Sequence, residues 1–246
     1  QHLYLSTPST SDVTVKITIL STGQEITYTD LRNDNPKVYQ LTADNPNQEQ
    51  ALNGVLFVDK DSTGANTLSS GLVIDADCPV YASIRYNAGA QAGALVSKGD
   101  ASLGTHFRTG MMTNGNQSDE NEFQNSTNSH NLNFISVMAT QDNTTVRIDL
   151  PNASPNLQIA NYNYNGNPIV QTLTRNESMI IAADARQPNN SGENRFALIG
   201  ALVRSIDDSG TVIVEDPTKP IVVNVGSASG TFMSTEGGHD HGVDQI

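Results

Sequence analysis

Alternation of apolar and polar residues runs through much of the chain and predicts β-strands. In the stretch DVTVKITIL, aliphatic residues occupy every second position from Val13 to Ile19, and polar residues fill the positions between them. This period of two is typical of a strand that buries one face and exposes the other. The next residues, STGQ at Ser21–Gln24, favour a turn into a second strand, EITYTDL. We therefore expect a β-hairpin near the N-terminus.

Further turn signals predict more strands and little helix. Asn165-Gly166, within NYNYNGNPIVQTL, favours a hairpin because both residues tolerate a positive φ. Asn53-Gly54 and Asn114-Gly115 are additional turn candidates. No window of about 12 residues keeps apolar residues at helical spacing without an interrupting Gly, Pro or Asn. The expected fold class is all-β.

The strand motifs recur in the same order along the chain. DVTVKITIL resembles NTTVRIDLP at 143–151, and GLVIDADCPVYASI at 71–84 resembles GTVIVEDPTKPIVVNV at 210–225. The polar, Asn-rich stretch at 113–131 has almost nothing to bury and is typical of a loop or linker. We therefore predict two tandem β-sandwich-like units related by internal duplication, a first β-rich unit at 1–112 and a second at 132–246.

Length and charge restrict the class of protein. The 246 residues suffice for one large domain or two of ordinary size. Lys and Arg number 13 against 26 Asp and Glu, which gives a formal charge of −13 and argues against nucleic acid as a partner. The chain begins with Gln1 rather than Met and shows no apolar run long enough to cross a bilayer. We expect an exported protein that has lost a signal peptide and continues beyond Ile246.

Cys78 is the single cysteine, so no disulfide can form within the chain. It lies in the apolar stretch VIDADCPVYASI, and no histidine is near it in sequence. This context predicts a buried, inert thiol rather than a nucleophile.

The final stretch, EGGHDHGVDQI, contains a candidate metal site. On a strand, His239 and His241 would share a face and could chelate zinc or copper. A third ligand would have to come from elsewhere, because the remaining histidines, His2, His106 and His130, are scattered along the chain. We therefore expect a folding element here rather than a metal centre.

A calcium loop is suggested by DKDSTGAN at 59–66, where Asp59 and Asp61 are weak calcium candidates. The stretch lacks the Glu that should close such a loop, which favours a solvated turn. No cofactor is expected. Asp61-Ser62-Thr63 also resembles the O-glycosylation signal of Bacteroidetes surface proteins.

Signs of catalysis are weak. The sequence contains no Gly-x-Ser-x-Gly elbow, and the paired carboxylates Asp207-Asp208 lie beside Gly210 in an expected turn. A glycosidase cleft is disfavoured because the chain has no Trp and only 13 Phe and Tyr together. We expect a protein that is not an enzyme. The alternative is an extracellular hydrolase that uses His241 with a carboxylate.

Four motifs in order resemble the N-terminal region shared by IgGFc-binding proteins and many bacterial cell-surface proteins. The resemblance covers about residues 70 to 246. The matching residues are Pro79-Val80, Leu103-Gly104-Thr105 with Phe107, the run Ala139–Val146 with Asp142, Thr144 and Thr145, and Asp240-His241 followed by Val243–Ile246 with Gln245. His239 departs from the pattern, because the family often has Cys there.

The resemblance implies an extracellular, β-rich domain without catalytic activity near the N-terminus of a large cell-surface adhesin. The expected partner is a surface protein or glycan, contacted through loops such as 113–131 and 59–66. An outer-membrane anchoring or secretion partner is a further candidate. The motif residues would be structural, with Asp240, His241 and Gln245 forming hydrogen bonds at the end of the second unit. The alternative within the binding class is a scaffold or filament subunit of a surface assembly.

Overall fold

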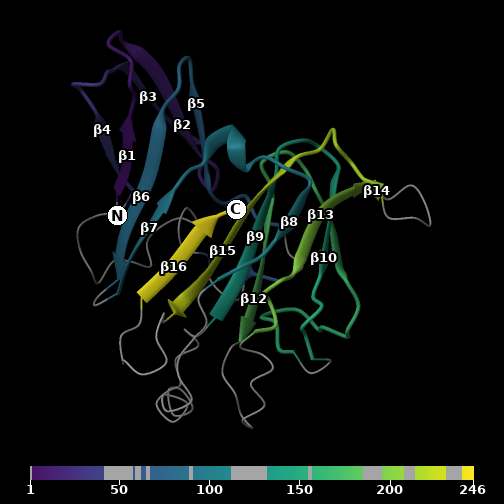
Figure 1. Ribbon diagram of the computed structural model, residues 1–246. Helices are drawn as coiled ribbons and strands as arrows, with labels where there is room; N and C mark the ends of the chain where they lie inside the picture. Colours follow the sequence, from purple (N-terminus) through teal and green to yellow (C-terminus); the bar gives the residue numbers. More distant parts are fainter. Residues whose placement is uncertain are drawn as a thin grey trace. The chain divides into compact units, whose positions relative to one another are not determined.

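The structure, a computed structural model, consists of antiparallel β-strands (Figure 1). It describes residues 2–41, 58, 62–64, 67–88, 91–111, 132–154, 157–184, 196–207, 214–230 and 240–246. Within these ranges the helical content is a single short 3-10 helix, η3 (Gly99–Ser102), and no helix could cross a membrane. The all-β class expected from the alternating pattern is confirmed.

The chain divides into two compact units. The first comprises Gln1–Asp59 and Ser69–Ser97, and the second comprises Lys60–Leu68 and Lys98–Ile246. The units expected from the repeated motifs, 1–112 and 132–246, were defined by sequence similarity rather than by contacts. That division stays a prediction. Its linker, 113–131, lies outside the described residues.

The first unit contains two antiparallel sheets. Their strand orders are β4-β1-β6-β7 and β3-β2-β5. The strands are β1 (His2–Ser6), β2 (Val13–Ile19), β3 (Gln24–Leu31), β4 (Lys37–Gln40), β5 (Leu72–Ala76), β6 (Tyr81–Ala88) and β7 (Gln91–Val96). The hairpin predicted near the N-terminus is confirmed, since β2 pairs with β3 and Gly23 has φ +69° in the turn.

Both sheets of the first unit contribute to one buried cluster. On β2, Val15 and Ile17 are fully buried, and on β1 the buried side chains are Leu3 and Leu5. These residues occupy alternate positions of their strands, so the residues between them face outward. The alternation in the sequence therefore predicts the core of this unit directly.

The second unit also contains two antiparallel sheets. Their strand orders are β12-β9-β15-β16 and β11-β10-β13-β14, and β8 also pairs with β13. The strands are β8 (His106–Arg108), β9 (Leu132–Ala139), β10 (Thr144–Asp149), β11 (Ile169–Leu173), β12 (Ser178–Asp184), β13 (Leu202–Asp207), β14 (Val214–Glu215), β15 (Ile221–Gly230) and β16 (Asp240–Gln245).

The pairings of the first unit recur in the second. They coincide when β1 to β5 are matched with β9 to β13, β6 with β15 and β7 with β16. Val15 and Val146, aligned by sequence, lie fully buried on the middle strands β2 and β10. In this matching β5 corresponds to β13, and the resemblance of 71–84 to 210–225 stays a prediction, because residues 208–213 lie outside the described residues.

The hairpin predicted at Asn165-Gly166 is also wrong. Gly166 does lie in a turn with φ +86°, and the Asn167 amide donates to the Asn165 side chain. The strand after this turn, β11, nevertheless pairs with the distant β10. Ile169 and Leu173 become almost fully buried in that pairing, which a local hairpin would not supply.

The segment Lys60–Leu68 belongs to the second unit although the first unit resumes after it in sequence. Leu68 exchanges two backbone hydrogen bonds with Ser178 of β12, of 2.7 and 2.8 Å. The Gly64 amide donates to the carbonyl of Ile180 on the same strand. The second unit is therefore built from two separate stretches of the chain.

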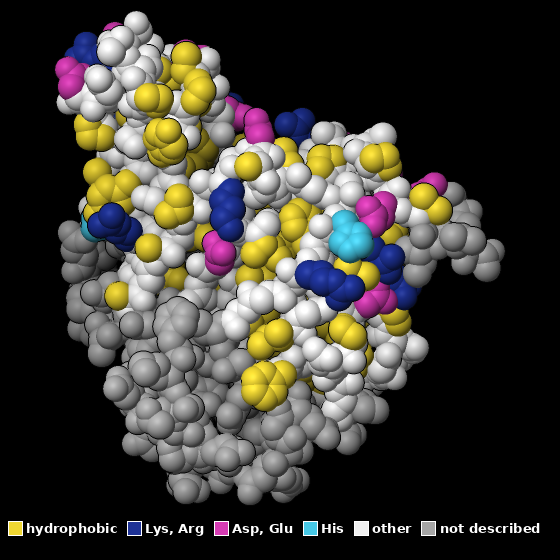
Figure 2. Space-filling model, in the orientation of Figure 1, with side chains coloured by type: hydrophobic (Ala, Val, Ile, Leu, Met, Phe, Trp, Pro, Cys, Tyr) yellow, Lys and Arg dark blue, Asp and Glu magenta, His cyan; other side chains and the backbone are white. Residues whose placement is uncertain are grey.

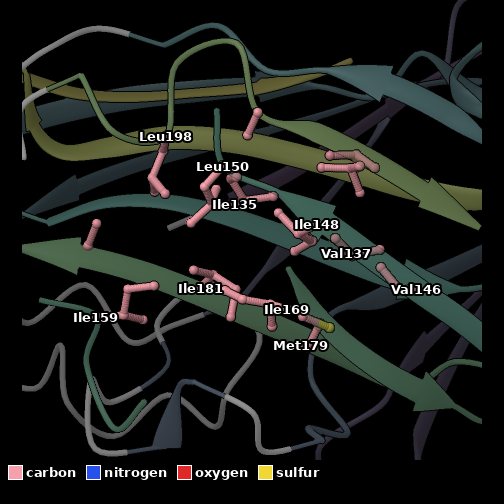
Figure 3. Close-up of a cluster of buried hydrophobic side chains, with 14 of the residues drawn as sticks. Ile135, Val137, Val146, Ile148, Leu150, Ile159, Ile169, Met179, Ile181 and Leu198 are labelled. Atoms are coloured by element: carbon pink, nitrogen blue, oxygen red, sulfur yellow. The ribbon is translucent and has the colours of Figure 1, made fainter. Parts of the chain in front are cut away.

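Aliphatic side chains from both sheets form the core of the second unit (Figure 3). Ile135 and Val137 project from β9, and Ile148 projects from β10 toward the same cluster. Met179 and Ile181 of β12 complete this part of the core. All five side chains are fully buried, so packing here fixes which face of each strand meets solvent.

Truncation of this core should destabilise the protein strongly. We expect Ile148→Ala to lower the free energy of unfolding by about 2–5 kcal/mol, because it removes apolar contacts and leaves a cavity. The control is Val170→Ala on β11, where the side chain is 45% exposed and a change within about 0.5 kcal/mol is expected. Urea unfolding followed by circular dichroism measures both. Equal losses would show that the assigned faces are wrong.

Candidate functional site

One face of the second unit carries a cluster of charged side chains at the middle of a sheet. On β10, Arg147 and Asp149 alternate with the buried Val146 and Ile148, so both point away from the core. The register places Arg204 of β13 directly opposite Arg147. The pairing of β10 with β13 therefore places these charged side chains next to one another on one face of the sheet.

Two neighbouring strands extend this cluster. His106 of β8 lies opposite Arg204 across the β8–β13 pairing. Glu215 of β14 lies opposite Ile206, two residues beyond Arg204 on β13. We call the five residues His106, Arg147, Asp149, Arg204 and Glu215 the charged face.

Asp149 accepts hydrogen bonds from two arginines. Nε and Nη2 of Arg147 donate to its carboxylate at 2.7–3.0 Å, and Nη2 of Arg204 donates to Oδ2 at 2.8 Å. Partial burial by itself raises the pKa of Asp149, but the hydrogen bonds and charges of the two arginines outweigh it and leave the pKa lowered. Asp149 therefore stays ionised and holds both guanidinium groups in place.

Glu215 forms the second carboxylate of the charged face. Its Oε1 lies 2.5 Å from Nδ1 of His106, and Oγ1 of Thr105 donates to Oε2 at 3.4 Å. The hydrogen bond from His106 is the largest cause of a lowered pKa at Glu215, and the nearby charge of Arg204 acts in the same direction. The side chains of His106 and Glu215 are 46% and 41% exposed, so a partner molecule can reach this pair.

The local balance of charge differs from that of the whole chain. Arg147 and Arg204 share one carboxylate, and the nearby Arg108 donates to the carbonyl of Gly200. Figure 2 shows the histidine, basic and acidic side chains gathered on this part of the surface. In a protein with a formal charge of −13, this face is therefore relatively rich in cations.

The arrangement is suited to recognition of charged groups. At the charged face, the Glu215 carboxylate accepts a hydrogen bond from the Thr105 hydroxyl and lies 2.5 Å from Nδ1 of His106. Both histidine and carboxylate are thus engaged in an ion-pair network on an exposed sheet.

The sequence did not point to these residues as a group. His106 counts among the scattered histidines there, and Glu215 is 109 residues away from it in sequence. Only strand pairing through β13 brings them together. In the sequence, Arg147 and Asp149 alternate with aliphatic residues, which predicts that both face outward. This alternation does not predict which strands lie beside β10.

The first family-motif residues lie at turns and short bridges. The carbonyl of Pro79 accepts a hydrogen bond from the Thr7 hydroxyl, and Val80 packs against the first core. Gly104 exchanges backbone hydrogen bonds with Ile221, and a Cβ on Gly104 would come within 2.9 Å of the Phe107 ring.

The neighbouring motif residues also contact other segments. Leu103 is 41% exposed, and its amide donates to the carbonyl of Asp100. Thr105 contacts Glu215 through its hydroxyl and accepts a backbone hydrogen bond from Ser205. This second motif therefore borders the charged face.

The third motif braces a turn before β10. Asp142 accepts a hydrogen bond from the Arg175 amide, and the buried Thr144 donates to the carbonyl of Gln141. Thr145 makes a hydroxyl contact with Thr172 on the adjacent strand β11. These contacts fix the position at which β10, and with it Arg147 and Asp149, begins.

The last motif forms the edge strand β16. The side chain of Gln245 accepts a 2.6 Å hydrogen bond from the Lys98 amide, and Asp244 forms an ion pair with the Lys98 ammonium group. A Cβ on Gly226 of β15 would collide with the carbonyl of Gly242, so glycine is needed where β16 pairs. Gln245 thus binds the start of the second unit's long segment.

Several residues considered in the sequence cannot be placed. His239, Asp59 and Asp61 lie outside the described residues, as do the side chains of Asp240 and His241. The zinc, calcium and hydrolase alternatives that depend on them are therefore untested. Within the described part of the chain, no three His, Cys, Asp or Glu side chains gather as a metal site would require.

The prediction of a buried thiol at Cys78 is wrong. Cys78 is exposed, in the turn between β5 and β6. The turn is fixed instead by its neighbours, since Asp77 accepts a hydrogen bond from the Thr14 amide and Pro79 accepts one from Thr7. The apolar residues around Cys78 in sequence belong to the flanking strands.

The fold and the charged face define an all-β protein with an exposed ion-pair network on one sheet. A sequence model of the family described as "IgGFc binding protein" matches residues 92–246. This match covers more than half of the chain, and the chain belongs to that family. It includes most of β7, the whole charged face and β16. Searches of curated proteins and of solved structures found no match.

Exposure of Cys78 makes a simple chemical prediction. Iodoacetamide should alkylate the native protein completely, with one adduct in the intact mass, because an exposed thiol needs no unfolding to react. The rate in native buffer should be close to the rate in urea. Modification that occurs only in urea would show that the turn between β5 and β6 is covered.

Removal of the Asp149 charge should give a stability loss that depends on pH. We expect Asp149→Asn to lower the free energy of unfolding by about 1.5–3 kcal/mol near pH 7, because the charge-assisted hydrogen bonds from Arg147 and Arg204 weaken. The folded-state pKa lies below the unfolded value of about 4, so the stabilisation is present above that value. It is lost as the pH falls through the folded-state pKa.

Urea unfolding at about pH 7 and about pH 2.5 measures this effect, and the difference between the variant and the parent should be smaller at the acidic value. The control is Asp34→Asn, where the carboxylate is 72% exposed and pairs with Arg32. That exposed pair should contribute less than about 1 kcal/mol at either pH. An equal loss for Asp149→Asn at both values would contradict the assigned ion pair.

Proposed function

We propose that this chain is a recognition domain of a secreted cell-surface adhesin and that it binds a protein ligand without catalysis. The observation that carries the proposal is the charged face, which lies on a sheet within the family-matched residues. A sheet holds its side chains in fixed register, so the binding geometry is set before a partner arrives.

The composition of the charged face supports recognition of a protein. Arginines held by carboxylates lose little side-chain entropy on binding, and arginine is enriched at interface hot spots. The exposed pair of His106 and Glu215 offers a donor and an acceptor beside them. Charges arranged in this way mainly govern specificity and the association rate.

The family description supports the class of ligand and the location. It names a protein that binds the Fc region of IgG, and for this chain we carry over only binding of a protein ligand. Membership supports an extracellular location, with which the acidic composition agrees. Anchoring at a bacterial outer membrane and the binding of glycans are finer alternatives within the same proposal.

We further propose that the two units are tandem β-sandwiches related by duplication. The recurring order of strand pairing supports this, as does the alignment of Val15 with Val146. Both sheets of each unit also contribute to one core. Duplication would have given two copies of one scaffold, and the β14 extension would then be an addition to the second copy.

The proposal predicts saturable binding that depends on the charged face. We expect the full chain to bind at least one member of a panel of extracellular proteins that includes immunoglobulin Fc fragments. The double substitution His106→Ala and Glu215→Ala should weaken that binding roughly tenfold or more, because it removes an exposed ion pair of the interface. Surface plasmon resonance measures the affinities.

A matched control lies in the first unit. Lys16 and Glu25 form an ion pair of 3.1 Å between neighbouring strands and are 42% and 56% exposed. Replacement of both by alanine should leave the affinity unchanged. Failure of every protein in the panel to bind, or an equal loss in both double variants, would refute the proposed role of the charged face.

A further inference from the structure

The outer face of the sheet β4-β1-β6-β7 in the first unit is unusually apolar. Of the eight exposed large hydrophobic residues in the described part of the chain, four lie on it, namely Tyr4, Val38, Tyr81 and Val96. Their exposed fractions are 37%, 50%, 66% and 58%. Scattered exposed apolar residues are ordinary on a protein, but a contiguous group marks an interaction site.

The register shows that these residues are contiguous. Tyr4 lies opposite Val38 on one side and Ser83 on the other, and Ser83 lies opposite Val96. These four residues form one row across all four strands. Tyr81, two residues before Ser83 on β6, faces the same side and lies diagonal to Tyr4.

Arg85 and His2 contact the Tyr4 ring on this surface. The guanidinium carbon of Arg85 lies 5.1 Å from the centroid of the Tyr4 ring. The rings of His2 and Tyr4 are 6.2 Å apart and tilted by 51°. These two contacts restrict the Tyr4 ring, so less conformational entropy is lost when the ring binds a partner.

The same face carries no carboxylate among its described residues. Its remaining outward side chains are Ser6, Gln40, Ser83, Ala92 and Ala94. In a chain with twice as many acidic as basic residues, the described part of this face is unusual because it includes Arg85 and no Asp or Glu. Figure 2 shows hydrophobic side chains at the surface of the first unit with basic side chains beside them.

We propose that this surface, the tyrosine face, docks a second protein that presents apolar side chains flanked by carboxylates. The tyrosine face comprises Tyr4, Val38, Tyr81 and Val96 together with His2 and Arg85. The apolar row supplies the contact area, and a partner carboxylate would pair with the Arg85 guanidinium, which no carboxylate among the described residues of this face neutralises. Tyrosine and arginine are also the residues most enriched at interface hot spots.

Charge and composition favour this occupant over two others. A second copy docked through the same face would bring a second Arg85 guanidinium to the interface and no described carboxylate to pair with either one, which is unfavourable. A carbohydrate would need free aromatic rings for stacking, whereas one face of Tyr4 is covered by Arg85 and the valines offer no ring. A protein segment with both acidic and apolar side chains could pack on the apolar row and pair with Arg85.

The tyrosine face lies outside the family-matched residues except for part of β7. It shares no residue with the charged face and belongs to the other unit. The two proposals can therefore fail independently. Substitutions at His106 and Glu215 report on the first, and substitutions at Tyr81 and Val96 report on the second.

The test is selection of a display library of random peptides, each of about 12 residues, against the immobilised full chain. This length spans four strands with residues to spare. We expect the selected peptides to combine Asp or Glu with aromatic or aliphatic residues. Synthetic copies should bind the protein with affinity measured by fluorescence anisotropy.

Substitutions on the face should abolish that binding selectively. We expect Tyr81→Ser with Val96→Ser to weaken it roughly tenfold or more, and Arg85→Ala to weaken it severalfold with a smaller salt dependence. Val170→Ser, an exposed valine of the second unit, is the matched control and should bind as the parent does. Circular dichroism verifies that each variant is folded.

Four outcomes would overturn the proposal. The selected peptides could lack carboxylates, or bind the Tyr81→Ser, Val96→Ser variant as tightly as the parent. Heparin fragments or sialyllactose could bind the parent and lose affinity in that variant while the peptides do not, which would assign the face to an anionic carbohydrate. Light scattering could show concentration-dependent association of the parent that the variant lacks, which would assign it to a second copy.

Discussion

Burial of alternate aliphatic side chains on paired sheets is the constraint on which every other feature of this protein depends. Val15 and Ile17 in one unit, and Val146 and Ile148 in the other, lie fully inside their cores. A slip of one residue in either strand would bring these side chains to solvent, so each register is strongly specified. The positions between them are thereby directed outward, where they are free to serve recognition.

The charged face and the tyrosine face use this constraint in different ways. In the first, Asp149 and Glu215 neutralise much of the positive charge, so the arginines are held in place and partly hidden. On the tyrosine face, apolar side chains remain at the surface beside the Arg85 guanidinium, and the described residues of that face include no anion. Ion-pair networks contribute mainly to selectivity, whereas desolvated aromatic and aliphatic side chains contribute most of the affinity at an interface. Two such surfaces on one chain would allow it to join two different proteins.

The sequence was sufficient to predict the class of fold and the inward faces, because these depend on local alternation. It correctly located the hairpin of β2 and β3, whose turn is only a few residues long. It failed at Asn165-Gly166, where the local turn signal was real but β11 found a buried place beside β10. It also failed at Cys78, because apolar neighbours in sequence do not determine the exposure of a residue in a turn.

Neither surface was predictable as a site. His106, Asp149 and Glu215 are brought together by pairings between strands far apart in sequence. Tyr4 and Tyr81 are separated by most of the first unit and become neighbours only through the β1–β6 pairing. A single sequence shows which residues of a strand share a face, but long-range register decides which strands lie next to it.

The discontinuous second unit restricts how this protein can be dissected. Leu68 and Gly64 hydrogen-bond to β12, yet Ser69–Ser97 returns the chain to the first unit before the second resumes. No single cleavage can therefore separate the units intact. A fragment that begins at Lys98 would leave the backbone groups of Ser178 and Ile180 without these partners, so a gene fragment cloned from the family-matched boundary would encode an incomplete fold with an unprotected strand.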